Sequence, residues 1–593
     1  MTVVGFDFGT TNSLVSSVSG GKPFNLLDED GLPFPSVVCY EGTRKILGRE
    51  AKQRLDSAGI GIHGNIIRSP KFFLGQDSLF VNGVERSPVD VVADVVAFVK
   101  QAALESRVDI DLAGISRAAV TIPIDMEGRR RAALRDAFRR AGIGVVQFIH
   151  EPFAALYGHF RGQADVAASL RQYENKHILV VDWGGGTLDL TLCTLRDGRV
   201  TQLHNHGTDA VGGDVLDDSI RNEVIRRFCA EAEVPPGAEP HPDARTRLLH
   251  QCEQAKIALS SRQSFPVYVP TFFHEDTDLD YSLHRDTLEQ IADPFVRDGI
   301  RRISHVLDQS GVAPTQVAMC LATGGMVNMP AIRARLHELF GPQRVKVKEE
   351  SGTLVAEGAA WFGHDRRPLH LAKNVELQLA RGSYMPLLRA GTKMPMQNEV
   401  QRHPFHLYCA DPRDGHAKFE FCSPERPGDT VLATDPRVPL AHLVVKADAK
   451  APPLKERLEL DVQIDDNLIL RASARSLNQQ DHAAVEIHDL EFGVWFPQVG
   501  RGSEPSAENM PLEQQRRTMQ RPGDLVVRAN VAKEPDPALV PGELLYEHNR
   551  LYFDRRRNPP QEQVDELLYY APCAVCGRAS NDPECRCLSR RST

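Results

Sequence analysis

The chain has 593 residues, of which 41% are hydrophobic and 25% are charged, and its formal net charge is -9. This length is too great for one hydrophobic core, so a globular protein of several domains is expected. The acidic balance argues against nucleic acid or an anionic membrane as the main partner, because both attract basic surfaces. Asp7 interrupts the first apolar run, and no apolar stretch is long enough to span a bilayer. We therefore expect a cytoplasmic protein that has neither a secretion signal nor a membrane segment.

The first part of the chain, residues 1–365, alternates between helix-like and strand-like segments. Apolar residues recur at helical spacing over 88–104 and 129–141, which predicts two helices. Short β-branched runs at 117–123 and 317–323 predict strands between such helices. The alternation predicts a layered α/β architecture.

The pattern changes after a linker predicted at 366–376. Over 377–497, short alternating segments such as "HAKFEFC", "LELDVQID" and "HAAVEIHDLEF" are separated by Gly, Pro, Asp and Asn. This is typical of an antiparallel β-sandwich. Residues 498–570 are rich in proline and polar residues, which predicts a poorly packed segment without a long helical lid. Most of the eleven cysteines stand singly in apolar runs, as buried reduced thiols do, whereas 571–593 form a cysteine-rich tail.

Two glycine-containing stretches have a common pattern. They are "VVGFDFGTTNSLVSSV" near the amino terminus and "ILVVDWGGGTLDLTLC" from residue 178. In each, a strand ends in Asp-x-Gly and a turn with threonine precedes a second strand. Glycine lets backbone N–H groups converge on an anion, and threonine adds hydroxyl donors. Two such hairpins would grip a phosphate chain from both sides, with Mg²⁺ between Asp7 and Asp182. The alternative is two unrelated hairpins with glycine-rich turns; neither stretch has the Walker or Rossmann pattern.

Several motifs resemble those of one family. "GFDFGTTNS", "VVDWGGGTLDLTL" and "CLATGGMVNMPAIRARL" resemble the two phosphate motifs and the adenosine motif of the actin-like ATPases. "PKFFLG", "VTIPIDMEGRRRAALRDA", "FIHEPFAALYG", "VGGDVLDDSI" and "CEQAKIALSS" narrow the resemblance to the DnaK-type heat-shock chaperones. It covers about the first 365 residues and extends more weakly into "ELDVQIDDNLILRASARS". The resemblance implies a two-lobed actin-like ATPase domain, followed by an antiparallel β-sandwich that binds substrate.

The resemblance implies a nucleotide site with defined roles. The β- and γ-phosphates of ATP or ADP would be held by Gly9, Thr10, Thr11 and Asn12 of the first loop and by Gly184, Gly185, Gly186 and Thr187 of the second. Asp7 and Asp182 would surround Mg²⁺ through water, because Mg²⁺ gives up its hydration shell reluctantly; K⁺ is a further candidate cation.

The implied catalytic residues are Lys71, Glu151, Asp182 and Thr187. The Lys71 ammonium would orient the attacking water and offset negative charge at the γ-phosphate. Glu151 and Asp182 would complete the network of water and cation, and Thr187 would touch the γ-phosphate. The ordinary alternatives are a solvated surface lysine and, for Glu151, a carboxylate that starts a helix beside Pro152.

The adenosine side of the site has its own spacing. In "HQCEQAKIALSS", Glu253, Lys256 and Ser260 fall on one helix face, where they offer an acceptor, a cation and a hydroxyl to the nucleoside. Without the resemblance, an exposed charged stripe would be the simpler interpretation. The resemblance adds backbone approach to the nucleotide at Gly213, Gly324 and Gly325, and it places Asn328 against adenine.

The sequence departs from the family pattern at several positions. Asn328 stands where the chaperones usually have arginine, so a guanidinium stack on adenine is lost. Gly352 replaces an aspartate, and His150 and Phe153 replace Asn and Thr; we assign His150 no role. Pro123 and Arg131 match residues of the family's interdomain relay, but "GHDRRPLHLAKNVELQL" lacks a clean run of leucines, so coupling between domains is open.

The cysteine-rich tail contains "CAVCGRASNDPECRC". Its Cys573, Cys576, Cys585 and Cys587 can supply four thiolates to a tetrahedral Zn²⁺ that docks a partner. The alternative is a tail of free or redox-active thiols.

These expectations lead to a cytoplasmic, ATP-hydrolysing chaperone that binds extended client polypeptides under nucleotide control. The resemblance adds a J-domain-type co-chaperone and a nucleotide-exchange factor as partners. A second hypothesis is a nucleotide-switched adaptor or scaffold that docks one dedicated partner. A third, a small-molecule kinase on the same fold, gives no reason for the β-rich domain.

Overall fold

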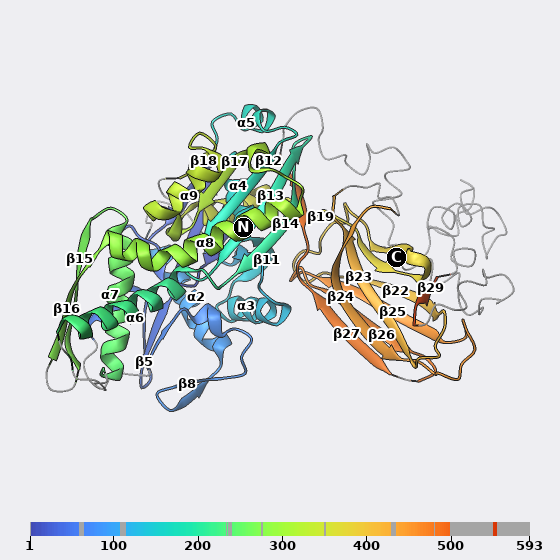
Figure 1. Ribbon diagram of the computed structural model, residues 1–593, viewed down its shortest axis with the longest axis horizontal. Coiled ribbons are helices and arrows are strands. Elements are labelled where there is room, and N and C mark those ends of the chain that lie inside the picture. Colours follow the sequence, from blue (N-terminus) through green and yellow to red (C-terminus); the bar gives the residue numbers. More distant parts are fainter. Residues whose placement is uncertain are drawn as a thin grey trace. The chain divides into compact units, whose positions relative to one another are not determined.

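The computed structural model describes residues 2–57, 65–106, 114–232, 234, 240–273, 277–348, 352–427, 434–479, 481–497 and 549–553. The chain divides into two compact units (Figure 1). The first unit comprises residues 1–369 together with 491–504, and the second comprises 370–490 together with 505–593. Each unit is described by itself.

The first unit contains a mixed sheet built around its amino-terminal strand. The strands are β1 (Val4–Phe8), β2 (Asn12–Ser19), β3 (Lys22–Leu26), β10 (Arg117–Ile122) and β11 (Gly144–His150), and β4 (Phe34–Pro35) pairs with β2. Their order is β11-β10-β1-β2-β3. β1, β10 and β11 run parallel, whereas β2 is antiparallel to both β1 and β3. The predicted strand at 117–123 is thus confirmed.

A second sheet of the same unit repeats this topology. Its strands are β12 (His177–Trp183), β13 (Leu188–Arg196), β14 (Arg199–Thr208), β17 (Val317–Thr323), β18 (Val345–Val347) and β28 (Phe492–Trp495). They follow the order β18-β17-β12-β13-β14-β28, with β12, β17 and β18 parallel and β12, β13 and β14 successively antiparallel. β12 therefore corresponds to β1, and Asp182 near its end corresponds to Asp7.

Helices α4 (Glu151–Arg161) and α10 (Leu354–Asp365) pack closely on each other and on the first sheet. A Cβ added to Gly358 of α10 would lie 1.8 Å from the carbonyl oxygen of Ala154 in α4. A Cβ added to Gly5 of β1 would lie 2.1 Å from the backbone nitrogen of Ala360. These glycines therefore allow helix and strand backbones to approach more closely than side chains would permit.

The remaining helices surround the two sheets. They are α1 (Gly48–Ser57), α2 (Pro88–Glu105), α3 (Gly128–Arg140), α5 (Val166–Gln172), α6 (Gly213–Glu231), α7 (Pro242–Leu259), α8 (Arg285–Gln309) and α9 (Pro330–Phe340), with short 3₁₀ turns at Pro70–Phe73, Pro314–Gln316 and Gly325–Asn328. α2 and α3 confirm the two helices predicted from apolar spacing. Small sheets are formed by β5 (Val37–Glu41), β6 (Arg44–Leu47) and β7 (Ile66–Arg68), by β8 (Leu79–Val81) and β9 (Val84–Arg86), and by β15 (Ser264–Phe273) and β16 (Thr277–His284).

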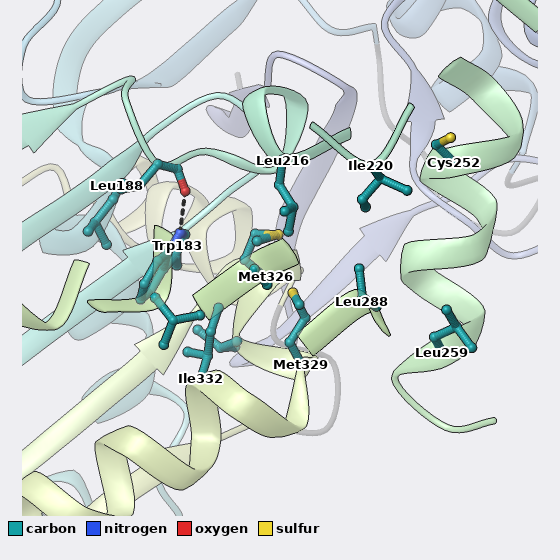
Figure 2. Packing of buried hydrophobic residues seen from close by; sticks show 14 of the residues in the cluster. Trp183, Leu188, Leu216, Ile220, Cys252, Leu259, Leu288, Met326, Met329 and Ile332 are labelled. Carbon is teal, nitrogen blue, oxygen red and sulfur yellow. Dashed lines mark hydrogen bonds between the residues drawn. The ribbon is translucent and has the colours of Figure 1, made fainter. Parts of the chain in front are cut away.

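One hydrophobic core supports the second sheet. Figure 2 shows residues from β12, β13, α6, α7, α8 and α9 gathered around Trp183, Leu216 and Met326. The Trp183 indole packs where any side chain at Gly299 of α8 would collide with it, because a Cβ there would lie 2.2 Å from the ring. Its Nε1 donates a hydrogen bond of 2.7 Å to the Val211 carbonyl. This core fixes the end of β12, immediately after Asp182.

The second unit is rich in antiparallel strands. Its strands are β19 (His370–Leu371), β20 (Val375–Gln378), β21 (Tyr384–Leu388), β22 (Val400–Cys409), β23 (His416–Pro424), β24 (Arg437–Lys446), β25 (Arg457–Asp465), β26 (Leu470–Ser476), β27 (His482–Ile487) and β29 (Leu551–Tyr552), with a 3₁₀ turn at Ala380–Gly382. One sheet has the order β21-β20-β23-β24 and another β27-β26-β25-β22-β29. β25 buries alternate residues, as its sequence pattern predicts.

One boundary differs from the sequence-based one. We expected the β-rich domain to continue to residue 497, but β28 pairs with β14 of the first unit through Val494 and Val200. In the segment predicted at 498–570 the structure describes residues 549–553, where Leu551 pairs with Cys409 of β22. The remainder of that segment and the cysteine-rich tail lie outside the described residues, except for 549–553.

The described cysteines agree with the expectation of reduced thiols. Seven lie in the part of the chain that the structure describes; all are free, and every one except Cys229 is buried. Among the described helices, none combines the length and apolarity needed to cross a bilayer.

Candidate functional site

The two glycine hairpins touch each other. A Cβ added to Gly185 would lie 2.5 Å from Thr11 Oγ1, and one added to Gly186 would lie 2.5 Å from Thr10 Oγ1. The turn after β12 is thus in contact with the turn after β1, through two glycines that leave room for two threonines. Residues of both turns line one cleft.

This cleft brings together most of the predicted site. Its lining includes Asp7, Gly9, Thr10, Thr11, Asn12, Lys71, Glu151, Asp182, Gly184, Gly185, Gly186, Thr187, Glu253, Lys256, Ser260, Gly324 and Gly325. Two predicted residues, Gly213 and Asn328, are not part of the lining. Sequence analysis assigned no binding role to six further lining residues: Asp214, Ile257, Met326, Met329, Gly352 and Val355. Pro123 also lines the cleft. Arg131, the other residue that matches the family's relay, is fully buried and donates to the Met126 carbonyl at 2.6 Å.

Lys71 is a buried cation paired with a carboxylate. It lies in the 3₁₀ turn Pro70–Phe73, its side chain is only 4% exposed, and its Nζ lies 2.9 Å from Glu151 Oε1. Glu151 is the first residue of α4. The alternative of a solvated surface lysine is therefore wrong. A desolvated ammonium of this kind interacts with charge far more strongly than one in water.

The aspartates at the ends of β1 and β12 are also buried. Burial, and then the nearby Glu151 carboxylate, raise the pKa of Asp7 to about 6, although Lys71 and the Thr121 hydroxyl act in the opposite direction. Thr121 Oγ1 donates to Asp7 Oδ1 at 2.7 Å. Burial and the neighbouring carboxylates of Glu151, Asp189 and Asp7 raise the pKa of Asp182 well above its usual range.

The cleft lining holds more carboxylates than cations, and burial raises the pKa of its two central aspartates. Lys71 lowers the pKa of both aspartates, but its one charge does not compensate for burial and carboxylate repulsion. A bound cation would supply the missing charge, so the residues fit Mg²⁺. Within the described residues, no three carboxylates, histidines or cysteines converge closely enough to ligate a metal directly. The arrangement fits a hydrated cation.

Asp189, on β13, is a site residue that sequence analysis missed. It is fully buried, and it accepts hydrogen bonds from Thr187 Oγ1 at 2.6 Å and from the Ile124 backbone N–H at 2.7 Å. Its signal in the sequence is the second aspartate of "GGGTLDLTL". Because the Thr187 hydroxyl donates its proton to Asp189, its oxygen faces other groups as an acceptor.

The backbone geometry at position 324 requires glycine. Its φ is +87°, and a Cβ would lie 2.4 Å from the Trp183 carbonyl oxygen and 2.7 Å from Asp182 Oδ1. Asp182, Trp183 and the turn after β17 are therefore packed together. Met326 and Met329 belong to the core of Figure 2 and also line the cleft, so the core reaches the site directly.

The predicted face of α7 reaches the cleft. Glu253, Lys256 and Ser260 all line it, although Ser260 stands at the helix end and its Oγ donates to the Lys256 carbonyl at 3.3 Å. Lys256 Nζ donates to Asp217 Oδ2 at 2.9 Å and to the Gly213 carbonyl at 3.1 Å. The exposed-stripe alternative fails, because Lys256 and Glu253 are buried.

Glu253 is surrounded by cations. Lys52 Nζ lies 3.4 Å from its Oε1, and Arg68 Nη2 lies 3.2 Å from its Oε2. Burial acts to raise the pKa of Glu253, but a hydrogen bond from His250 and the charges of Lys52 and Arg68 hold it below its usual range. Glu253 thus remains a charged acceptor at the cleft wall.

The two predicted residues outside the lining have other contacts. Asn328 Oδ1 accepts from Arg333 Nη2 at 2.7 Å at the start of α9. Gly213 begins α6, where a Cβ would lie 2.8 Å from Lys256 Nζ and 3.3 Å from the Gly185 Cα. It therefore lies close to two cleft-lining residues, Lys256 and Gly185.

The chain is similar to several known proteins. The family model described as Hsp70 protein matches residues 3–378. The Chaperone protein HscA homolog of Bordetella petrii is 31% identical over 432 residues, which are 65% of this chain and 65% of that protein. The Chaperone protein DnaK of Ureaplasma parvum is 25% identical over 530 residues, 86% of this chain and 81% of that protein.

A second HscA homolog, from Pseudomonas fluorescens, is 29% identical over 377 residues, covering 60% of this chain and 56% of the relative. The chain thus spans just under two thirds of the Bordetella relative and about four fifths of the Ureaplasma one. The family model covers more than half of the chain, and residues of the chain build one cleft from two repeated hairpins. The chain therefore belongs to the Hsp70 protein family, a family of ATPases.

Proposed function

We propose that this protein is a cytoplasmic ATP-dependent chaperone that hydrolyses ATP in the cleft and binds extended client polypeptides under nucleotide control. The observation that carries the proposal is the contact between the two hairpins, Gly185 and Gly186 against Thr11 and Thr10. Backbone N–H groups from two directions suit a triphosphate, and a buried Lys71 stands at the same cleft.

The residues of the cleft have different roles in ATP hydrolysis. The oxygen of an attacking water bonds to the γ-phosphorus, the bond to the departing ADP oxygen breaks, and one proton of the water passes to an oxygen of the phosphate that is released. Lys71, held by Glu151 at 2.9 Å, offsets the negative charge that develops. Thr187, whose proton is committed to Asp189, accepts a hydrogen bond from the water and orients it.

Asp7 and Asp182 would hold Mg²⁺ through water, and the bound ion would neutralise phosphate charge. K⁺ would occupy the same carboxylate-rich region. Glu253, Lys256 and Ser260 would contact the nucleoside, as would the backbone of Gly324 and Gly325.

The second unit would hold the client as a β-sandwich. Val400, Val438 and Val444 are 61%, 38% and 41% exposed on its strands, and exposed apolar side chains beside strands suit an extended peptide. A J-domain-type co-chaperone and a nucleotide-exchange factor would be the regulatory partners. A Zn²⁺ site at Cys573, Cys576, Cys585 and Cys587 stays a separate proposal, outside the described residues.

The test combines ATP turnover, nucleotide binding and peptide binding in wild type and Lys71→Ala. We expect turnover to fall about 10²- to 10³-fold while ATP binding persists, as for a residue that acts on the transition state. Apolar peptides should bind broadly and dissociate faster with ATP. Unchanged turnover in the variant would overturn the catalytic assignment, and one tight protein partner without peptide affinity would favour the adaptor.

A further inference from the structure

A short segment of the first unit comes from far along the chain. We call residues 492–496 the strap. Its strand β28 pairs with β14 through Val494 and Val200, and the backbone N–H of Phe492 donates to Gln202 Oε1 at 2.8 Å. At its far end the N–H of Phe496 donates to the Gly198 carbonyl at 3.0 Å. The strap is therefore bonded along its whole length to the edge of the second sheet.

The strap also holds helix α4 at two places. The Phe492 ring lies with its centroid 5.5 Å from that of His150, the residue before the helix. Two turns further on, the Phe496 ring stacks on Tyr157 at 4.7 Å and meets Phe160 edge-on at 5.7 Å. Phe492 is 1% exposed and Phe496 is 5% exposed, so both are core side chains. One segment thus fixes the start of α4 and its middle.

Glu151 lies between these two contacts of the strap with α4. It is the first residue of α4, adjacent to His150, and its carboxylate holds Lys71 at 2.9 Å. A small rotation or slide of α4 would move this carboxylate and the ammonium with it. The rate of catalysis depends strongly on the positions of the catalytic groups, because a displacement of about 1 Å can lower the rate about 10²-fold.

We propose that Phe492 and Phe496 are positioning residues for Glu151, and that the strap sets the rate of ATP hydrolysis by fixing α4. The strap continues directly from β27, which ends at Ile487 in the second unit, through residues 488–491. A rearrangement of β27 would therefore reach α4 along the chain itself. The inference rests on the proposed hydrolysis, and it gives His150 a purpose, as the ring on which Phe492 packs.

The experiment uses the full chain and measures kcat, ATP affinity and thermal stability for Phe492→Ala, Phe496→Ala and His150→Ala. We expect kcat to fall about tenfold while the Kd for ATP changes less than about twofold, because the strap acts on the Glu151–Lys71 pair and does not itself line the cleft. The double variant His150→Ala/Phe492→Ala should be no slower than Phe492→Ala alone, because the two rings act as one unit. Phe496→Tyr, which keeps the stacked ring, should retain the wild-type rate.

The matched control is Phe340→Ala in α9, which removes a fully buried phenyl ring of the same unit away from α4. It should lower thermal stability without lowering kcat at a temperature where the protein is folded. Wild-type kcat in both strap variants, or an equal loss of kcat in Phe340→Ala, would overturn the inference. If the alanine variants do not fold, Phe492→Leu, which keeps most of the volume without the ring, decides in the same way. Wild type that binds ATP without hydrolysing it would overturn the proposed hydrolysis, and the inference with it.

Discussion

The contact between Gly186 and Thr10 gives a direct steric prediction. In Gly186→Ala the new Cβ would lie 2.5, 3.0 and 3.2 Å from the Oγ1, Cβ and Cγ2 atoms of Thr10. Ordinary contacts are about 3.5–4.0 Å. A rotation of the threonine can move Oγ1 and Cγ2 but not Cβ, so the hairpins must separate by roughly 0.5–1 Å, the difference between those distances.

The expected losses of unfolding free energy and of ATP affinity follow from this separation. Overpacking of this kind typically costs about 1–3 kcal/mol of unfolding free energy. Losing one charge-assisted hydrogen bond to a phosphate costs about 1.5–3 kcal/mol, and every 1.4 kcal/mol is about tenfold in affinity. We therefore expect Gly186→Ala to unfold at lower denaturant concentration without nucleotide and to bind ATP about 10- to 100-fold more weakly.

The assay is denaturant unfolding of the nucleotide-free protein, together with calorimetric titration of ATP. Gly325→Ala is the matched control for stability, because a Cβ there meets no atom within 4 Å; its unfolding free energy should stay within about 0.5 kcal/mol of wild type. Thr10→Ala in the Gly186→Ala background should recover part of the lost stability. A Gly186→Ala protein as stable as wild type, with unchanged ATP affinity, would refute the hairpin contact.

Three further predictions concern charge in and beyond the cleft. Burial raises the pKa of Asp7 to about 6 from 3.8, so between those values the folded state binds the extra proton and this group's contribution to stability falls as pH rises. Mg²⁺ must displace that proton, so Mg·ATP affinity should weaken as pH falls below 6, and Asp7→Asn should remove part of this dependence and leave the part due to Asp182; a flat profile in wild type would contradict the assignment. Lys256→Met leaves Asp217 buried without its cation, and we expect a loss of about 3–5 kcal/mol in denaturant unfolding at neutral pH, which Lys256→Met/Asp217→Asn should largely restore. If the tail cysteines bind Zn²⁺, metal analysis of the purified chain should find about one ion, which Cys573→Ser should remove; a metal-free wild type defeats the site.

Much of the site could be predicted because its signals are local. Asp7 and Asp182 each precede a glycine turn at the end of an apolar strand, and this pattern determines backbone geometry without help from distant residues. Helical spacing puts Glu253, Lys256 and Ser260 on one face of α7, whereas the role of that face in the nucleotide site was implied by the family resemblance. The repeated topology of the two sheets explains why both hairpins reach one cleft.

Other parts depend on tertiary placement. Asp217 is an acidic residue in an ordinary helix, and only the fold brings it to Lys256. Asp189 lies two residues after Thr187, but only the fold brings it to the Ile124 backbone N–H. Asn328 follows the adenosine-motif glycines, but its side chain accepts from Arg333 and stays outside the cleft lining. Neighbouring positions in a motif need not face the same space.

The strap shows a limit of pattern analysis. "HAAVEIHDLEF" has one alternating pattern, yet β27 ends at Ile487 and β28 begins at Phe492 in another sheet. Period-two spacing indicates a strand, but it does not say which sheet the strand joins. β29 is only two residues long and too short for any pattern to indicate.

The most direct test of the central claim is a calorimetric comparison of ATP, ADP, AMP and adenosine, with Mg²⁺ and with a chelator. If the paired hairpins hold a phosphate chain, affinity should rise steeply from AMP to ADP and ATP, and most of that gain should vanish without Mg²⁺. Equal affinities for adenosine and ATP would contradict the account, and so would a gain in affinity from AMP to ATP that is the same with and without Mg²⁺.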